Sequence, residues 1–287
     1  MDEHELAWAA GFFDGDGWAA LIHDHRRSRG QPHAQINQGS EHGVPEVLIR
    51  FRDAVGVGRV AGPKIEEGRQ PLYWWIASSR PDVARTGELI GPWLSNEKRD
   101  QFSGAVGLRF DTRSLDSFSW AAGLFDAEGC VSLSKHRTHA GYKVIDAAVT
   151  QGGPSGIPQE LQRFGSLLGI GHNYGPYEQD GANEPVYRWR AQTLDGVRRV
   201  LHLLLPRLGE VKRQQAFEAI AIVDGQPTLP RGRVEWGSHK THCSHGHEYA
   251  SARLRPYVSR GGTERRPSKQ CLTCTREQAH RRRATAK

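Results

Sequence analysis

Two short segments of this sequence place small and acidic residues in the same order. The first is Ala9-Ala10-Gly11-Phe12-Phe13-Asp14-Gly15-Asp16-Gly17, and the second is Ala121-Ala122-Gly123-Leu124-Phe125-Asp126-Ala127-Glu128-Gly129, 112 residues later. Carboxylate oxygens are the ligands that Mg²⁺ prefers in proteins. Two carboxylates that hold a metal beside a phosphate suit hydrolysis of a phosphodiester by a metal-activated water. Asp16 and Glu128, the last acid of each segment, are therefore the candidate metal ligands.

Each acidic segment ends a short helix whose interior residues are small. The apolar pattern at 5–13 predicts a helix that Gly17 ends, and the second copy repeats this pattern. Glycine inside a helix costs about 1 kcal/mol relative to alanine, so Gly11 and Gly123 indicate that two helix backbones pack closely. Two acidic helix C-termini side by side would oppose both helix dipoles and each other, and a divalent cation would relieve this repulsion. An ordinary helix-end acid explains one such residue but not its recurrence.

Later landmarks repeat at nearly the same offset. Ile36-Asn37-Gln38 matches Val149-Thr150-Gln151, and Tyr73-Trp74-Trp75 matches Tyr187-Arg188-Trp189. Pro92-Trp93-Leu94, with Lys98 after it, matches Pro206-Arg207-Leu208, with Lys212 after it. This order indicates a tandem duplication of a unit of roughly 110 residues, which suits two similar subdomains. We expect a first repeat at 1–113, a second repeat at 114–226, a linker at 227–240 and a basic module at 241–287.

The residue pattern of each unit is helix, strand, strand, helix, strand, strand, helix. In the first unit, strands at 19–24, 34–38 and 72–77 alternate with helices at 45–55 and 81–94. In the second unit, strands at 131–135, 144–150 and 185–191 alternate with helices at 157–168, 197–205 and 212–223. These periodicities predict an α+β fold built from two αββαββα repeats.

The segments at 9–17 and 121–129 resemble the LAGLIDADG signature of homing endonucleases, in the single-chain form with two repeats. The resemblance covers about residues 5–225 and includes the order of the later landmarks. It implies two antiparallel sheets in a pseudo-twofold saddle, Mg²⁺ held by Asp16 and Glu128, and a structural role for Asp14 and Asp126 at the helix pair.

The resemblance further implies that two glutamines and two lysines line the active site: Gln38, Gln151, Lys98 and Lys212. A glutamine at a strand end could hold a water, and a lysine could stabilise charge on the phosphate. A polar surface residue is the alternative for each one alone. The sequence departs from the family pattern where Ala9 and Ala121 replace a leading leucine, and where one motif ends in Asp and the other in Glu.

Side chains on an open sheet face could read base edges in the major groove, because strand residues alternate between the two faces. The candidates of this kind are His33, Gln35, Asn37, Ser132, Ser134, Asp146, Thr150, Arg188 and Arg190. Basic residues at strand ends and hairpin loops would contact phosphates, and these are Arg26, Arg27, Arg29, Lys135, Arg137 and Lys143. A solvated sheet face is the alternative, and a slip of one residue would reverse the assignment. Since the two halves differ, an asymmetric target is expected.

The C-terminal part of the chain holds the basic excess. Residues 231–287 contain 14 Lys and Arg against 4 Asp and Glu, a net charge of +10, and the other 230 residues contain 25 and 28, a net charge of −3. Such an asymmetry favours nucleic acid as a partner. A solvated tail is the other interpretation.

Three of the four cysteines lie in this basic tail. Cys243 and His247 precede a Cys-x-x-Cys pair at Cys271 and Cys274. Together they make a Cys₃His set for tetrahedral Zn²⁺, with His242, His245 and His280 as other candidates for the histidine. An incidental grouping in a disordered tail is the alternative. Cys130, beside Glu128, is expected to be a small buried residue.

These features predict a monomeric, Mg²⁺-dependent endonuclease of the homing type, encoded by a mobile element, that cuts both strands of double-stranded DNA. A non-cleaving DNA-binding regulator and an intron RNA maturase remain alternatives. There is no apolar run of about 18 residues, and the acidic N-terminus lacks the basic start of a signal peptide. We therefore expect no membrane association and a location in the cytoplasm or nucleoid of a bacterial or phage-infected cell.

Overall fold

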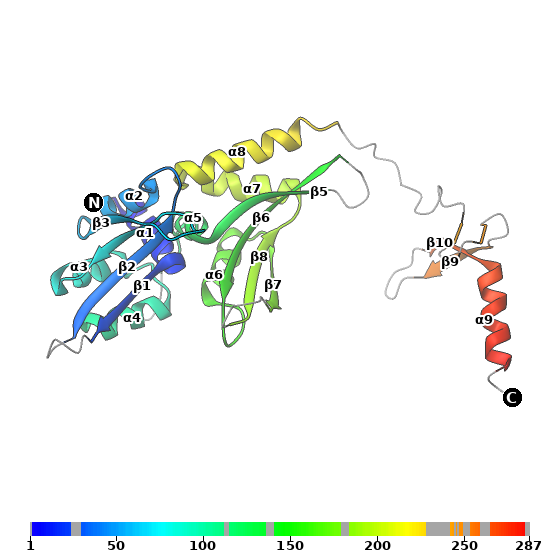
Figure 1. Ribbon diagram of the computed structural model, residues 1–287, viewed down its shortest axis with the longest axis horizontal. Coiled ribbons are helices and arrows are strands. Elements are labelled where there is room, and N and C mark those ends of the chain that lie inside the picture. Colours follow the sequence, from blue (N-terminus) through cyan, green and yellow to red (C-terminus); the bar gives the residue numbers. More distant parts are fainter. Residues whose placement is uncertain are drawn as a thin grey trace. The chain divides into compact units, whose positions relative to one another are not determined.

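The computed structural model describes residues 2–23, 30–111, 115–135, 141–178, 184–227, 242–243, 245, 247–248, 253–258 and 265–284. The chain forms two compact units, Met1–Gln226 and Pro227–Lys287 (Figure 1). The first unit contains both acidic segments, and the second contains Cys243, Cys271 and Cys274.

The first unit is built from two repeats with the same order of elements. The first repeat comprises α1 (Glu3–Asp16), β1 (Gly17–Ile22), β2 (Gln31–Gly39), α2 (Glu46–Val55), β3 (Arg59–Lys64), β4 (Leu72–Ala77), α3 (Arg80–Ile90) and α4 (Asn96–Val106). The second repeat comprises α5 (Phe118–Glu128), β5 (Gly129–Lys135), β6 (Lys143–Gly152), α6 (Gln159–Leu168), β7 (His172–Tyr177), β8 (Val186–Ala191), α7 (Leu194–Leu204), the short η1 (Leu205–Arg207) and α8 (Glu210–Asp224).

Each repeat has one four-stranded antiparallel sheet, with the matching strand orders β1-β2-β4-β3 and β5-β6-β8-β7. Figure 1 shows the two sheets on opposite sides of the α1–α5 pair. This architecture confirms the predicted α+β fold of two αββαββα repeats, each extended by a further helix.

Two strands, β3 and β7, have no clear signal in the sequence. Both lie at a sheet edge and are mostly exposed, so they lack the alternation of apolar residues that marks a half-buried strand. Each contains a Gly-Pro pair, at Gly62 and Gly175, where the glycine has a positive φ of 118° and 128° respectively. Proline within a sheet is confined to edges and bulges, and the strand register shifts at both sites.

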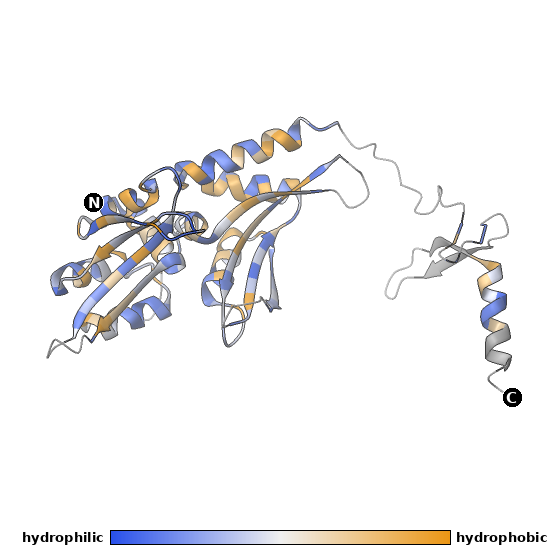
Figure 2. Ribbon diagram, viewed as in Figure 1, coloured by the Kyte–Doolittle hydropathy of each residue, from blue (hydrophilic) through white to orange (hydrophobic). Residues whose placement is uncertain are grey.

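The core lies between the sheets and the helices that cover one face of each. The residues of β2, β4 and β8 are alternately more and less buried, so one row of side chains lies in this core and the other row on the uncovered face. Figure 2 shows hydrophilic and hydrophobic residues following one another along β2. Trp75 and Trp189 occupy equivalent positions on β4 and β8, and both are fully buried. The duplication therefore extends to the large side chains that fix each sheet against its helices.

Helices α1 and α5 pack backbone against backbone at the centre of this unit. A Cβ added to Gly11 would lie 1.9 Å from the carbonyl oxygen of Trp120, and one added to Gly123 would lie 1.9 Å from that of Trp8. No side chain fits at such a separation, so glycine is required at both positions. The close helix packing predicted from these glycines is present.

The second unit has a hairpin followed by a helix. Strands β9 (Arg253–Val258) and β10 (Arg265–Gln270) pair in antiparallel fashion, and α9 (Leu272–Ala284) follows. None of the helices among the described residues is both long and apolar enough to span a bilayer.

Candidate active site

Asp16 and Glu128 are the last residues of α1 and α5. These two helix ends adjoin, because a Cβ added to Gly15 would lie 3.1 Å from Cγ of Glu128 and 2.4 Å from Cβ of Ala127. The following glycine, at 17 or 129, ends each helix and starts the first strand of its sheet. The repeat thus brings the two predicted metal ligands to one place at the base of both sheets.

Burial makes both carboxylates harder to ionise, and the charge of Asp16 adds to this effect at Glu128. Burial raises the pKa of Asp16 to about 6, although Lys212, Gln38 and Lys98 oppose the rise. The pKa of Glu128 rises to about 7, first through burial and then through the negative charge of Asp16. Two acids that repel each other in this way form a site that a divalent cation would stabilise, because it offsets the charge of both.

Three further predicted residues surround this pair. Gln38, at the end of β2, donates from Nε2 to Oδ2 of Asp16 at 2.5 Å. Lys212 of α8 donates from Nζ to the backbone oxygen of Gly129 at 2.6 Å. Lys98, in the first turn of α4, is largely buried, and its charge lowers the pKa of both acids. The two lysines are therefore positioned where they could attract a phosphate toward the carboxylates.

Gln151 has a different environment from Gln38. It lines a hollow of about 650 Å³ that is also bounded by Glu128, Lys98 and the segment 152–160. Among the contacts of the described residues, none joins the Gln151 amide to Glu128, whereas Gln38 is bonded directly to Asp16. The two halves of the site therefore differ in the contacts of their glutamines.

The earlier acids of the two segments hold the helix pair together. Asp14 accepts hydrogen bonds from Nε1 of Trp120 at 2.7 Å and from the backbone N–H of Ser95 at 3.0 Å. Asp126 accepts the equivalent bonds from Trp8 and Gly209, both at 2.7 Å. Burial raises the pKa of Asp14 to about 7 and that of Asp126 to about 6. Each aspartate thus joins its own helix to the tryptophan of the other.

Sequence reasoning missed two arginines that complete this arrangement. The guanidinium of Arg50 lies 3.9 Å from the ring centroid of Trp8, and that of Arg163 lies 3.7 Å from that of Trp120. Such cation–π contacts are stronger when partly shielded from water, as here. The available signal was their recurrence, since Arg50 and Arg163 lie 113 residues apart in equivalent helices.

The predicted base-reading residues lie on the uncovered faces of the sheets. In β2, His33, Gln35 and Asn37 alternate with buried Pro32, Ala34 and Ile36. In the second repeat the strand registers place Ser132, Ser134, Thr150, Arg188 and Arg190 on the equivalent face. Lys135 and Lys143 pair at the exposed end of the β5–β6 hairpin. Arg26, Arg27, Arg29 and Arg137 lie outside the described residues.

Cys130 corrects one expectation. It is exposed rather than buried, and it lies on the uncovered face of β5 opposite Ala148. The reason is strand parity, because Gly129 before it is buried against Phe125 and the next side chain must point the other way.

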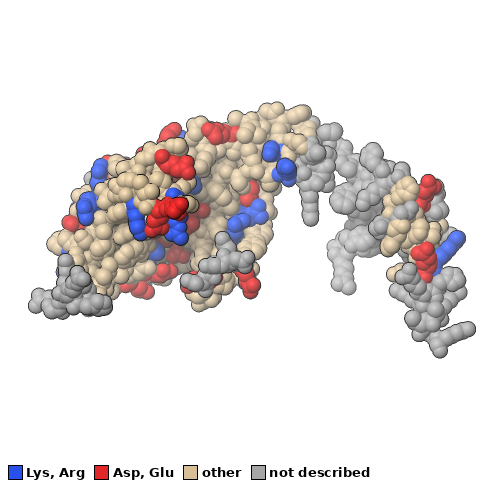
Figure 3. All heavy atoms as spheres, in the orientation of Figure 1, with Lys and Arg blue, Asp and Glu red and all other residues tan. Residues whose placement is uncertain are grey.

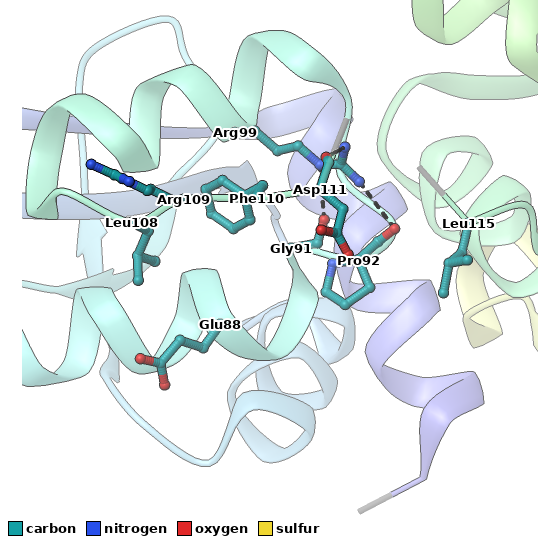
Figure 4. A pocket seen from close by; sticks show the side chains of 9 residues that line it. All are labelled: Glu88, Gly91, Pro92, Arg99, Leu108, Arg109, Phe110, Asp111 and Leu115. Carbon is teal, nitrogen blue, oxygen red and sulfur yellow. Dashed lines mark hydrogen bonds between the residues drawn. The ribbon is translucent and has the colours of Figure 1, made fainter. Parts of the chain in front are cut away.

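A second hollow, of about 350 Å³, lies beside α3, α4 and the segment that leads to the second repeat (Figure 4). Its wall includes Arg99, which donates to the backbone oxygens of Gly91, Pro92 and Asp111. Because these bonds fix the connecting segment, we interpret Arg99 as a structural residue.

The second unit gathers the predicted zinc ligands. One ligand atom from each of Cys243, His247, Cys271 and Cys274 lies within 4.8 Å of the others. The Sγ atoms of Cys243 and Cys274 are 3.7 Å apart, and Nδ1 of His247 is 3.7 Å from Sγ of Cys271. Zn–S bonds of about 2.3 Å put tetrahedral ligands roughly 3.8 Å apart, so this donor set fits zinc.

The other nitrogen of His247 supports that ligand choice. Its Nε2 lies 3.7 Å from a carboxylate oxygen of Glu277 in α9, and zinc-binding histidines commonly face a carboxylate in this way. Nδ1 of His245 is also 3.5 Å from Sγ of Cys274, so His245 lies within reach as a competing ligand.

Paired acidic helices between two four-stranded sheets are the arrangement of the LAGLIDADG homing endonuclease fold, and structural comparison identifies that fold in this chain. The LAGLIDADG meganuclease I-AabMI bound to uncleaved DNA superposes with a TM-score of 0.56 at 16% identity, covering 76% of this chain and 90% of that chain. The LAGLIDADG homing endonuclease I-GzeII in complex with its DNA target gives a TM-score of 0.54 at 13% identity, covering 76% and 89%. No protein-family model and no curated protein matches the sequence.

Proposed function

We propose that this protein is a Mg²⁺-dependent DNA endonuclease of the homing type, which cuts both strands of a long asymmetric duplex target. The observation that carries the proposal is the convergence of Asp16 and Glu128, from two different repeats, at adjoining helix ends with Lys98 and Lys212 close by. A duplex has twofold symmetry relating its strands, so a pseudo-twofold site offers equivalent groups to each strand.

Mg²⁺ held by Asp16 and Glu128 would supply an activated water and positive charge for the phosphate oxygens. The role of Gln38 is to orient the Asp16 carboxylate through its hydrogen bond. Gln151 lines the hollow beside Glu128, where its amide can hold a water. Lys98 and Lys212 stabilise the negative charge that builds on the phosphate in the transition state. One chain supplies both carboxylates, so a monomer suffices.

The structural relatives support DNA as the substrate, since both I-AabMI and I-GzeII are described as bound to DNA. We assign base reading to the uncovered sheet faces and phosphate contacts to the strand ends. Acidic and basic side chains are interspersed on the face of the first unit drawn in Figure 3. On that face, attraction to the phosphate backbone would depend on particular basic residues rather than on a broad positive field.

The second unit would add to that attraction. We propose that Cys243, His247, Cys271 and Cys274 bind one Zn²⁺, which joins the segment that precedes the hairpin to the start of α9. The net charge of +10 over residues 231–287 then supplies phosphate contacts outside the two repeats. Acting on DNA as the nuclease of a mobile element, the protein would work inside the cell, in the cytoplasm or nucleoid.

The proposal is tested by a cleavage selection. Purified protein is incubated with randomised duplex DNA in Mg²⁺, and the cut ends are sequenced, with Ca²⁺ and Glu128→Gln as parallel controls. Enrichment of asymmetric sites of roughly 20 base pairs with wild type in Mg²⁺ alone is expected. Bound but uncut sites would identify a DNA-binding regulator instead, and retention of structured RNA without either would indicate a maturase. The presence of both acids favours the nuclease.

A further inference from the structure

The two uncovered sheet faces carry different chemistry at equivalent positions. In the first repeat, the register of β2 with β4 places Asn37 opposite Trp74 and Gln35 opposite Ile76. In the second repeat, the equivalent register places Thr150 opposite Arg188 and Ala148 opposite Arg190. The two repeats therefore differ at these positions: the second has two arginines where the first has an aromatic and an aliphatic residue.

Both arginines are held by side chains of the neighbouring strand. Arg190 donates from Nε and Nη2 to the Asp146 carboxylate at 2.9 to 3.2 Å. Arg188 donates from Nε to Oγ1 of Thr150 at 3.0 Å. A guanidinium has five N–H donors, so each arginine keeps a pair of donors on Nη1 and Nη2 that these contacts leave unused. That pair matches the two acceptors, O6 and N7, that guanine presents in the major groove.

In the first repeat the corresponding polar group is an amide pair. Gln35 donates from Nε2 to Oδ1 of Asn37 at 2.6 Å. This bond leaves Oε1 of Gln35 as an acceptor and Nδ2 of Asn37 as a donor, side by side on the same face. Adenine presents the complementary pair in the major groove, an N6 donor and an N7 acceptor. Guanine presents two acceptors and would need two donors, whereas this amide pair offers one donor and one acceptor and carries no charge.

We infer that the two halves of the DNA target differ in base content: the second repeat reads two guanines through Arg188 and Arg190, and the first repeat reads an adenine through Gln35 and Asn37. Residues two apart on a strand are separated by about 7 Å, which is two base-pair steps of about 3.4 Å. The two guanines are thus separated by one intervening position. Thr150 and Asp146 act as positioning residues that hold each guanidinium toward the bases. This inference rests on the proposed function.

The test uses the Glu128→Gln chain, so that binding is measured without cleavage. Sequences bound from a randomised duplex library in Mg²⁺ are expected to contain one half-site with two guanines separated by one base pair. Adding Arg190→Ala should reduce discrimination at one of these positions by about 10- to 100-fold and leave the other half-site unchanged. Gln35→Ala should relax an adenine position in the opposite half-site.

Asp146→Asn separates a positioning role from a merely structural one. It should lower discrimination at the position that Arg190 reads while leaving affinity for non-specific DNA equal or higher, because the released guanidinium can contact phosphates. Arg52→Ala is the matched control. Arg52 forms a similar arginine–aspartate pair with Asp53 in α2, at 2.7 Å, and both side chains are exposed. It should change no base preference.

The outcomes distinguish this inference from the proposed function. Specific enrichment without guanines in either half, or with guanines that Arg188→Ala and Arg190→Ala leave equally preferred, would overturn the inference while the nuclease assignment stands. Absence of any enriched duplex sequence would overturn both the inference and the proposed function.

Discussion

The outer contacts of the candidate active site are the same in both repeats, whereas its inner contacts differ. The outer contacts are duplicated almost atom for atom: Asp14 bonds to Trp120 as Asp126 bonds to Trp8, and an arginine covers each tryptophan. The inner contacts differ, because Gln38 bonds to Asp16 while Gln151 lines a hollow beside Glu128. The helix pair constrains both repeats equally, whereas in the proposed function each carboxylate would act on a different DNA strand, so its contacts can differ.

The largest effect is expected from removing either carboxylate. Asp16→Asn or Glu128→Gln should lower double-strand cutting by roughly a hundred- to a thousandfold, because each change removes a carboxylate ligand of the Mg²⁺ that would stabilise the negative charge of the transition state. Conversion of supercoiled plasmid carrying the target to linear product measures the effect, and binding in Ca²⁺ is the control. Normal linearisation by both single variants would show that the metal ligands are assigned wrongly.

Equal effects are expected from the two glycines of the helix interface. Gly11→Ala and Gly123→Ala should each destabilise the fold by about 1–3 kcal/mol or more, because the added Cβ meets a backbone carbonyl that cannot rotate away. Urea denaturation measures the change. Gly104→Ala in α4 is the matched control, since its Cβ would meet nothing within 4 Å, and it should stabilise by about 0.5–1 kcal/mol. A larger loss of stability for one of the two variants would show that the repeats do not contribute equally to the helix pair.

The glutamines should separate the two halves. Loss of a hydrogen bond to a charged group costs about 1.5–3 kcal/mol, so Gln38→Ala should slow cutting by roughly 10- to 100-fold, and Gln151→Ala should slow it less. Strand-specific end labels are expected to show that Gln38→Ala leaves nicked product with one strand preferentially intact. Identical rates and nicking patterns for the two variants would mean that the asymmetry of the contacts has no kinetic consequence.

The smallest effect on chemistry is expected from the second unit, which lies outside the duplication. Elemental analysis should find about one zinc per chain, and Cys271→Ser with Cys274→Ser should remove it. Cleavage should then need more protein or less salt, with the balance between strands unchanged. His247→Ala against His245→Ala identifies the fourth ligand, and an unaltered zinc content in the double cysteine variant would exclude this site.

Much of the fold of the first unit could be predicted because the same pattern of residues occurs twice in the chain. Recurrence of the acids and glycines at one offset indicated both the helix pair and the meeting of Asp16 with Glu128. Cross-strand partners could not be predicted in the same way, since the pairing of Arg190 with Asp146 depends on a register that brings together residues 44 positions apart. The exposed side of Cys130 likewise depends on strand parity, and β3 and β7 are exposed edges without an apolar pattern.

The close approach of α1 and α5 also bears on how such proteins can be altered. Because each glycine faces a backbone carbonyl of the other helix, the central contact between the repeats contains little that is particular to one partner. We therefore expect that a repeat can be exchanged for one from another protein of this fold, or joined to a copy of itself, provided that the glycine, the aspartate and the tryptophan of the helix pair are kept. Joining two second repeats in this way would give a chain suited to a palindromic target.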